Sequence, residues 1–386
     1  MSKIYTALGT MSGTSLDGID LSIIRTDGED HLSLSRNDYL EFSNNLKQKI
    51  RTIKSKITST AECKKVINSN EYKDLSKEIT ILHQEGLIKA AGRSGSTRGD
   101  GPIDIIGFHG ITLWHKPTDR YTHQIGDTKL LKNTIVKNKN LKNSQIIFNF
   151  RENDILNGGQ GAPLTPIYHK ALMKHLKIVD PRLIVNIGGI TNVTYLNRGN
   201  IFSTDVGPGN CLIDQWIKKN FDKDFDEGGK VSLEGKINKN LADNFLNKLQ
   251  EKNKNKNVSY DTSDFNILEF NRLKPKDGAA TLSFITAKAI LNFAKDLELK
   301  RIIISGGGRF NQAILNNLIK DRFIISLIDD VKSSQGDDPV LNLNGNFIES
   351  QAFAYLAVRS YLKLPISFPE TTGVQKSCLG GELLKI

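Results

Sequence analysis

The sequence is poor in cysteine and has no long apolar run. Its three cysteines, Cys63, Cys211 and Cys378, lie far apart and form no CxxC pair, so a disulfide framework is not expected. No stretch approaches the roughly 18–20 apolar residues that a membrane span needs. The first apolar run, Ile4 to Leu8, is too short for the core of a signal peptide. We therefore expect a reduced, soluble protein of the cytoplasm with no membrane partner.

Acidic residues are outnumbered, 42 against 53 Lys and Arg, which gives a net charge of +11. The excess lies mostly in two Lys/Asn-rich stretches, Asn44–Lys65 and Lys236–Asn257. Neither stretch has the regularly interleaved arginines and aromatic residues of a nucleic-acid surface. Solvated helix faces explain them better, so nucleic acid is not an expected partner.

The length exceeds one ordinary domain. The chain has 386 residues, whereas a typical domain has about 100–200. The mix of 38% hydrophobic and 25% charged residues is typical of a folded protein. Two domains are therefore expected.

Alternating strand and helix patterns predict an α/β architecture. A strand, small-residue loop and strand unit occurs near residue 4 and again near residue 183, which suggests two similar halves with a ligand cleft between them. After a strand at Ile19–Ile24, we expect a polar helical stretch up to about Asn70. Further helices are expected over Lys73–Ala91, from about Cys211, and over Ala280–Leu297, Gln312–Lys320 and Ile348–Tyr361.

Four loops at predicted strand ends share glycines, small hydroxyls and a carboxylate or amide. Such loops let backbone N–H groups approach a phosphate closely, although each taken alone could be an ordinary tight turn. The P-loop motif GxxxxGK[ST] and the GxGxxG motif are both absent, so a nucleotide would be held in another way. The loops are Gly9–Asp20, Gly188–Thr191, Asp205–Asn210 and Ser305–Asn311.

Three aspartates in or near these loops are candidates for chemistry. Asp17 suits a Mg²⁺ anchor, often through water, because it lies beside the amides expected to hold phosphates; the alternative is a turn cap. The role of Asp20 stays open. Asp205 follows a strand and precedes Gly-Pro-Gly, a position that suits a general base or, alternatively, an Asx turn.

The segment Phe148–His169 is too irregular for a core element and is rich in side chains that bind sugar hydroxyls and carboxylates. Arg151 could pair with a substrate carboxylate or form an inter-domain salt bridge. The donors and acceptors of this segment are Arg151, Asp154, Gln160 and His169.

The histidines His109, His115 and His123 do not have the spacing of a zinc site and have no cysteine nearby. Structural or substrate-contacting roles are expected for them. Glu349 opens the predicted helix Ile348–Tyr361, where it is either a helix-start residue favoured by the dipole or a polar contact in the cleft.

The sequence as a whole resembles a known family, the 1,6-anhydro-N-acetylmuramic acid kinases. The resemblance runs from Lys3 to Gly381. It rests on the following segments in order: GTMSGTSLDGID, GFHG-T-WH, RENDILNGGQGAPLTP-YH, NIGGITNVTYL, DVGPGN, SGGGRFN, ES-AFAYLA, TTGV and LGG.

The resemblance implies an actin/Hsp70/hexokinase-like (ribonuclease H-like) fold with ATP and Mg²⁺ in a cleft between two domains. We expect the first domain to span residues 1–135 with about 365–386, and the second 136–364. The implied reaction converts ATP, water and 1,6-anhydro-N-acetylmuramic acid to N-acetylmuramic acid 6-phosphate and ADP. This step belongs to peptidoglycan recycling in the cytoplasm, by an enzyme that is typically a homodimer.

The matching motifs also imply roles for single residues. Asp205 is the expected catalytic base, and Asp17 the expected Mg²⁺ residue. The substrate-side residues are His109, Arg151, Asp154, Gln160 and Glu349. The expected ATP contacts are Gly13, Thr14, Ser15, Leu16, Asp17, Gly18, Ile19, Asp20, Gly188, Gly207, Gly209, Asn210, Gly306, Gly307 and Asn311.

The chain departs from the family pattern at Ile111, where glutamine is usual, at Asn149, and at Phe225, where glycine is usual. Two alternatives to the leading hypothesis stay open. One is a kinase of another N-acetylated hexose on the same fold, and the other is an inactive nucleotide-binding regulator.

Overall fold

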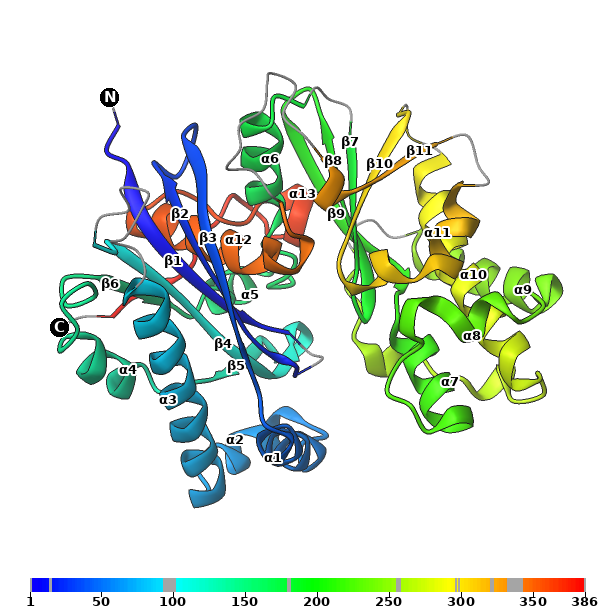
Figure 1. The fold of residues 1–386 in the computed structure, drawn as a ribbon, viewed down its shortest axis with the longest axis horizontal. Coiled ribbons are helices and arrows are strands. Elements are labelled where there is room, and N and C mark those ends of the chain that lie inside the picture. The colour runs from blue at the N-terminus through cyan, green and yellow to red at the C-terminus, as the bar shows by residue number, and fades with distance from the viewer. Residues whose placement is uncertain are drawn as a thin grey trace. The chain divides into compact units, whose positions relative to one another are not determined.

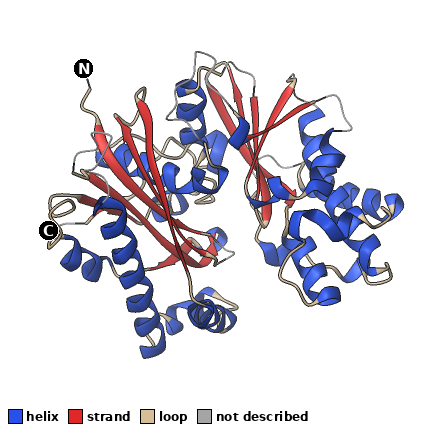
Figure 2. Cartoon of the chain, viewed as in Figure 1, coloured by secondary structure: helices blue, strands red, loops and turns tan. Residues whose placement is uncertain are grey.

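The computed structural model describes residues 2–13, 16–92, 102–178, 182–254, 258–295, 297, 299–319, 323–331 and 343–384. They form two compact units, each built around its own sheet (Figure 1). The first unit contains the described residues up to Ile178 and from Phe347 onward; the second contains those of 182–331 and 343–346. Figure 2 shows both as mixtures of strands and helices. The predicted α/β class is confirmed.

The sheet of the first unit is mixed. β1 is parallel to β4 and antiparallel to β2, and β4 is parallel to β6. β5 pairs with β4 away from the main order. In spatial order the strands are β12 (Glu382–Leu383), β6 (Gln145–Phe148), β4 (Ile105–Lys116), β1 (Tyr5–Ser12), β2 (Gly18–Thr26) and β3 (Leu32–Glu41), and β5 covers Tyr121–Ile125.

The helices of the first unit are α1 (Asn44–Ser55), α2 (Thr60–Val66), α3 (Asn70–Gly92), α4 (Thr128–Ile135), α5 (Glu152–Leu156), α6 (Pro166–His175), α12 (Ile348–Tyr361) and α13 (Pro369–Thr372). Helix α3 packs on β2 and β3, and α12 packs on β1, β2 and β4.

The two faces of the first sheet follow from the period of two along a strand. Leu8 and Leu21 belong to an apolar cluster that includes residues of α3. Gly9 and Ser22, one position further along, point to the other face, where the Ser22 Oγ lies 2.7 Å from the Ser350 Oγ of α12. Small residues such as Gly9 and Ser22 therefore face α12, and Leu8 and Leu21 face α3.

Helix α12 lies unusually close to the sheet because two glycines face it. A Cβ on Gly9 would lie 2.1 Å from the Ser350 carbonyl oxygen, and a Cβ on Gly107 would lie 2.4 Å from that of Phe353. Any side chain at either position would collide with helix backbone. This contact sets the position of the helix that carries Glu349.

The second sheet repeats the order of the first. β9–β8–β7–β10–β11 has two antiparallel pairs followed by two parallel pairs, as does β3–β2–β1–β4–β6. The duplicated architecture that the sequence predicts is thus present in the strand pairing. These strands are β7 (Arg182–Ile187), β8 (Ile190–Asn197), β9 (Asn200–Pro208), β10 (Arg301–Ser305) and β11 (Ile324–Leu327).

The helices of the second unit enclose a separate apolar core. The longest of them, α10, is built largely of buried small and apolar residues, and its Gly278 leaves room for the Trp216 ring of α7. The helices are α7 (Cys211–Phe221), α8 (Lys230–Leu233), α9 (Lys239–Lys252), α10 (Pro275–Lys295) and α11 (Gln312–Ile319).

Two sequence-based expectations need correction. The stretch after Thr26 is not helical throughout, because β3 occupies Leu32–Glu41 and pairs along the whole of β2. The compact units also do not coincide with the expected domains. β6 and α12 both belong to the first unit, because one pairs with β4 and the other packs on β1. The change between units therefore falls after Ile178 rather than after residue 135. Across the described ranges, no helix combines the length and apolarity needed to cross a bilayer.

We predict that Gly9→Ala destabilises the protein by about 3 kcal/mol or more, because neither the strand nor the helix backbone can yield to the new methyl group. The matched control is Gly92→Ala at the end of α3, where a Cβ would meet nothing within 4 Å. That change should be neutral or stabilising by less than about 1 kcal/mol. Urea unfolding of both variants measures the difference, and equal stabilities would contradict the close packing of α12.

Candidate active site

The loop between β1 and β2 makes a tight turn. The Leu16 N–H donates to the Gly13 carbonyl at 3.2 Å, and Leu16 has a left-handed φ of 59°. Asp17, the residue predicted to meet Mg²⁺ through water, is exposed. The predicted ATP contacts Thr14 and Ser15 lie outside the described residues.

Where the loop ends, Gly18 and Ile19 open β2 with their side-chain positions turned into the protein. A Cβ on Gly18 would lie 2.3 Å from the Leu40 carbonyl oxygen, and the Ile19 side chain is fully buried in the core. Only backbone atoms of these two predicted ATP contacts could face a ligand.

Asp20 shares the α12 face of the sheet with Ser22, two positions along β2. Partial burial, together with the negative charges of Glu349 and Asp17, raises the pKa of Asp20 to about 7. Burial also raises the pKa of Glu349, against the opposing charge of Arg151. These carboxyl groups therefore form one coupled electrostatic group in the first unit.

Ser12 is a polar residue that sequence reasoning missed. It ends β1 directly before Gly13, and its Oγ is buried without a hydrogen-bond partner among the described residues. A buried hydroxyl without a partner is costly, so a ligand held by the following loop is one group that could satisfy it. Its place in the motif GTMSGTS was the only available signal.

The guanidinium of Arg151 is held inside the first unit. Its Nε donates to the His109 Nε2 at 3.0 Å, and its Nη1 donates to the Gly161 carbonyl at 2.8 Å. Burial lowers the Arg151 pKa to about 10, while the charges of Glu349 and Asp154 oppose this shift. The group stays cationic at neutral pH, and no hydrogen bond to Nη2 occurs among the described residues. The Nε and Nη1 of Arg151 therefore bind partners in the same unit and do not form the inter-domain salt bridge considered from the sequence.

His109 is a neutral imidazole. Its Nε2 accepts from Arg151, so the proton resides on Nδ1, which donates to the Gly110 carbonyl at 2.9 Å. Burial and the neighbouring Arg151 charge hold its pKa well below the usual value. The ring also packs on Phe353 of α12, with centroids 4.4 Å apart. His109 thus orients the Arg151 guanidinium and is itself uncharged.

Asp154 and Gln160 organise the GGQGAP loop. The buried Asp154 carboxylate accepts from the Gly161 N–H at 2.6 Å and from the Thr372 hydroxyl at 2.6 Å. The Gln160 carbonyl meets the His115 Nε2 at 2.9 Å. Both carboxylate oxygens of Asp154 therefore accept hydrogen bonds within the protein, which gives this side chain a loop-ordering role.

The remaining histidines have structural surroundings. The His123 Nε2 lies 2.6 Å from the Tyr72 hydroxyl, and His169 is buried in α6, where burial lowers its pKa to about 4. Across the described ranges, no group of three or more His, Cys, Asp or Glu side chains is placed to hold a metal ion. A nucleotide-borne Mg²⁺ needs only one or two carboxylates beside phosphates and water, which the exposed Asp17 and nearby Asp20 can supply.

In the second unit, Asp205 lies on β9 beside a bulge at Val206 and is 8% exposed. The Tyr260 N–H donates to its Oδ2 at 2.7 Å. Burial raises the Asp205 pKa to about 7, and the Tyr260 bond partly opposes that rise. A carboxyl group with a pKa near neutrality is suited to general-base catalysis.

Several residues predicted to bind ATP in this unit have contacts within the fold. The N–H groups of Gly209 and Asn210 donate to the carbonyls of Gly189 and Gly188 at 2.9 and 2.8 Å. A Cβ on Gly207 would lie 2.6 Å from the Leu249 side chain. The loops containing Gly188 and Gly209 are thus joined to each other, and phosphate binding through the amides of Gly209 and Asn210 has no support.

The loop SGGGRFN (305–311) is held in place by the side chain of its own Arg309. This buried guanidinium pairs with Asp329 through Nε at 2.6 Å and through Nη2 at 3.3 Å. Gly306 has a φ of 78°, and a Cβ there would lie 2.5 Å from the Asn186 Oδ1. Gly307 has open space, since the nearest atom would lie 4.0 Å from its Cβ.

The side chain of Asn311 caps α11. Its Oδ1 accepts from the N–H groups of Ala313 and Ile314 at 3.0 and 3.2 Å. This predicted ATP contact therefore has a helix-capping role.

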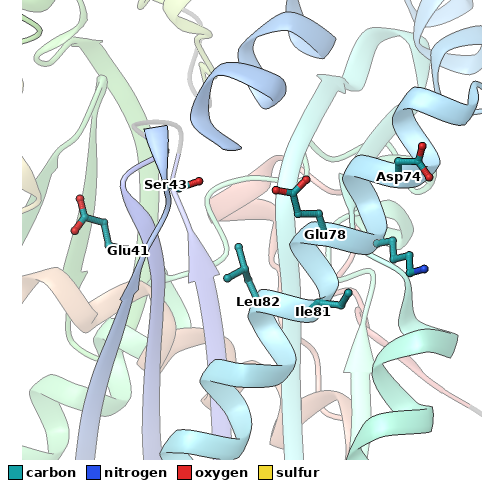
Figure 3. A pocket seen from close by; sticks show the side chains of 7 residues that line it. Glu41, Ser43, Asp74, Glu78, Ile81 and Leu82 are labelled. Atoms are coloured by element: carbon teal, nitrogen blue, oxygen red, sulfur yellow. The ribbon is translucent and has the colours of Figure 1, made fainter. Parts of the chain in front are cut away.

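A hollow of about 410 Å³ lies at the end of β3 against α3 (Figure 3). None of its lining residues is a predicted site residue, and the chemistry described above lies elsewhere. The lining residues are Glu41, Ser43, Asp74, Lys77, Glu78, Ile81 and Leu82.

Comparison with known proteins decides the family. Residues 5–385 match the family model of anhydro-N-acetylmuramic acid kinase. An anhydro-N-acetylmuramic acid kinase of Pelagibacter ubique is 39% identical over 400 residues, covering 100% of both chains, and one of Agrobacterium fabrum is 35% identical over 397 residues with the same coverage. The chain belongs to the anhydro-N-acetylmuramic acid kinase family.

Overlap with solved structures is looser. Component A of (R)-2-hydroxyglutaryl-CoA dehydratase from Acidaminococcus fermentans covers 93% of this chain and 99% of its own, at 10% identity and a TM-score of 0.41. An overlap at this level has no bearing on function.

The three departures from the family pattern have different surroundings. Ile111 is buried in the apolar cluster of the first unit, beside Ser12 on the next strand. Asn149 has a left-handed φ of 54° and bonds to Glu152. Phe225 is 60% exposed. Ile111 removes no substrate-facing amide, because its side chain points into the core.

We predict that Asp205 makes stability depend on pH. Because the folded pKa of about 7 exceeds the ordinary value of 3.8, the folded state holds this proton more tightly, and the contribution is lost as pH rises from about 4 to 7. The unfolding free energy of the wild type minus that of Asp205→Asn should fall by up to about 4 kcal/mol over that window. Chemical denaturation of both proteins at pH 4, 5.5, 7 and 8.5 measures it. A difference that stays constant with pH would contradict the burial of this carboxyl group.

Proposed function

We propose that the protein is an ATP-dependent kinase that opens the anhydro ring of 1,6-anhydro-N-acetylmuramic acid and phosphorylates O6. The products are N-acetylmuramic acid 6-phosphate and ADP. Membership of the family supports the substrate and the reaction class. The observation that carries the mechanism is the buried Asp205 carboxyl group, held by one N–H and with a pKa near 7.

Asp205 acts as the base for water. As the water oxygen bonds to the anomeric carbon, Asp205 takes the proton, and the bond between C1 and O6 breaks with its electron pair left on O6. That oxygen bonds to the γ-phosphorus of ATP, and the bond between that phosphorus and the β,γ-bridging oxygen breaks to release ADP. Every atom of the water ends on C1 or on Asp205, which returns its proton to solvent.

This sequence of bonds explains why one carboxyl group is enough. A glycosidase normally uses a second carboxyl group to protonate the departing oxygen. Here the departing O6 is captured by the phosphoryl group, so no acid is needed at that position. The isolation of Asp205 from other charges fits a base that works alone, since no charged group shifts its pKa among the described residues.

On the sugar side, Arg151 is the group best suited to the substrate carboxylate. Its Nε and Nη1 bind His109 and Gly161, which orients the cation and leaves Nη2 for a ligand. Glu349, partly accessible on α12, can accept from a sugar hydroxyl. Asp154 and Gln160 keep the GGQGAP loop in shape and support the site indirectly.

On the nucleotide side, Asp17 and Asp20 are the groups that could hold Mg²⁺, Asp17 through water. The cation would neutralise charge on the transferring phosphoryl group. It would also relieve the repulsion that raises the pKa of Asp20. Gly307, which has open space at its Cβ position, allows close approach of the nucleotide to the loop that follows β10.

A homodimer and a cytoplasmic location remain predictions. Light scattering of the purified protein tests the dimer, for which a mass near 86 kDa, twice the 43.0 kDa of one chain, is expected.

We predict that ADP release depends on 1,6-anhydro-N-acetylmuramic acid and falls about 10²–10⁴-fold in Asp205→Asn. A coupled ADP assay gives the rate, and mass spectrometry of the sugar should show the addition of both water and a phosphoryl group. The control is Asp214→Asn, which alters a carboxyl group on α7 whose pKa is also raised to about 7 by burial. A folded wild type without sugar-dependent ADP release would contradict the proposed function.

We predict that Arg151→Lys raises the KM for the sugar about tenfold or more, since a hydrogen bond to a charged group is worth about 1.5–3 kcal/mol. The KM for ATP should change less than about twofold. Arg36→Lys on β3, where the arginine pairs with Asp38, is the matched control. A KM for the sugar equal to that of wild type would remove Arg151 from the substrate site.

A further inference from the structure

A short segment, Val258–Tyr260, lies along β9, the edge strand of the second sheet. The Asp205 N–H donates to the Val258 carbonyl at 3.0 Å, and the Val258 N–H donates to the Thr204 Oγ1 at 3.1 Å. The Tyr260 N–H then reaches the Asp205 Oδ2 at 2.7 Å. The carboxylate of Asp205 thus depends on the placement of a segment 55 residues further along the chain.

The side chain of Asn253 holds this segment from the end of α9. Its Oδ1 accepts from the Tyr260 hydroxyl at 2.7 Å, and its Nδ2 donates to the Val206 carbonyl at 3.0 Å. Burial and the charges of Asp205 and Asp264 raise the pKa of Tyr260 to about 12, so the hydroxyl keeps its proton and is the donor.

Both bonds of Asn253 act on residues next to the base. Val206 is the bulged residue that follows Asp205 on β9, and Tyr260 supplies the only hydrogen bond to the Asp205 carboxylate among the described residues. One amide side chain therefore links the backbone on one side of the base to the residue that orients its carboxylate.

We propose that the side chains of Asn253 and Tyr260 form a positioning clamp for Asp205. The proposal rests on the proposed function, because it assigns the clamp to the base of that reaction. Neither side chain is a catalytic residue; both act through Asp205. A base that must take a proton from one water molecule gains rate from a fixed orientation, and a single hydrogen bond cannot fix a carboxylate unless its donor is itself held.

The hydrogen bond from the Tyr260 N–H is the main contribution to the Asp205 pKa that a substitution can change. Within the described part of the chain, no charged side chain of β8, α10 or the 258–264 segment shifts the Asp205 pKa; Tyr260 is the titratable neighbour, with Asp264 beyond it. A purely structural role for Tyr260 would rest on its ring, which packs on Phe265 with centroids 5.0 Å apart. Tyr260→Phe keeps the ring and removes only the hydroxyl.

The test compares Tyr260→Phe, Asn253→Ala and the double variant with Tyr195→Phe, which removes a hydroxyl from β8 in the same sheet. We expect kcat to fall about three- to tenfold in each single variant, with the KM of both substrates within about twofold of wild type. The acidic limb of the pH–rate profile should move to higher pH, because a looser Tyr260 N–H bond lowers the Asp205 pKa less. The double variant should lose no more than the larger single loss.

The effect of the clamp on the Asp205 carboxyl group can be measured without enzymatic turnover. A ¹³C-carboxyl titration of each protein, compared with the same protein carrying Asp205→Asn, gives the Asp205 pKa directly. A higher value in Tyr260→Phe and Asn253→Ala than in Tyr195→Phe supports the clamp, even if the wild type turns out to be inactive on the sugar. The clamp is overturned if kcat, the acidic limb of the pH–rate profile and the carboxyl titration are all unchanged in both Tyr260→Phe and Asn253→Ala. If sugar kinase activity still needs Asp205 in that case, the proposed function stands without the clamp.

Discussion

The contact of the α12 backbone with β1 and β4 is the constraint on which the first unit depends. Gly9 and Gly107 let the helix lie against the sheet, and this closeness brings Glu349 into the same electrostatic group as Asp20 and Arg151. The same helix places Phe353 under His109. A side chain at either glycine would therefore disturb the carboxyl group, the cation and the histidine together.

Burial raises the pKa of one aspartate in each unit, but the charges around the two aspartates differ. Asp20 has a raised pKa because it is buried beside other carboxyl groups, an arrangement that attracts a cation. Asp205 has a raised pKa with no charged neighbour to shift it among the described residues, an arrangement that favours a proton acceptor. The two carboxyl side chains thus have raised pKa values for different reasons, one beside other carboxyl groups and one without a charged neighbour that shifts it among the described residues.

Local features were predictable from the sequence, and long-range pairings were not. The bounds of α12 agree with the pattern at Ile348–Tyr361, and α7 begins at Cys211 as expected. The polar residues after Leu34 concealed β3, whose only sequence signal was the alternation from Leu32 to Leu34. Asp205 was expected to follow a strand that ended at Thr204, but β9 continues to Pro208 and Asp205 lies within it. Its Tyr260 partner is a backbone N–H, which leaves no mark in the sequence. Asn311 and Asp154 were recognised as important side chains, yet only the hydrogen bonds show that they cap a helix and order a loop.

The most direct test of the mechanism is to run the reaction in H₂¹⁸O and locate the label in the product at early times. The account predicts one ¹⁸O on the anomeric carbon of N-acetylmuramic acid 6-phosphate, with unlabelled O6 and an unlabelled phosphoryl group. Label in the phosphate, or a phosphorylated sugar whose anhydro ring is still closed, would contradict it.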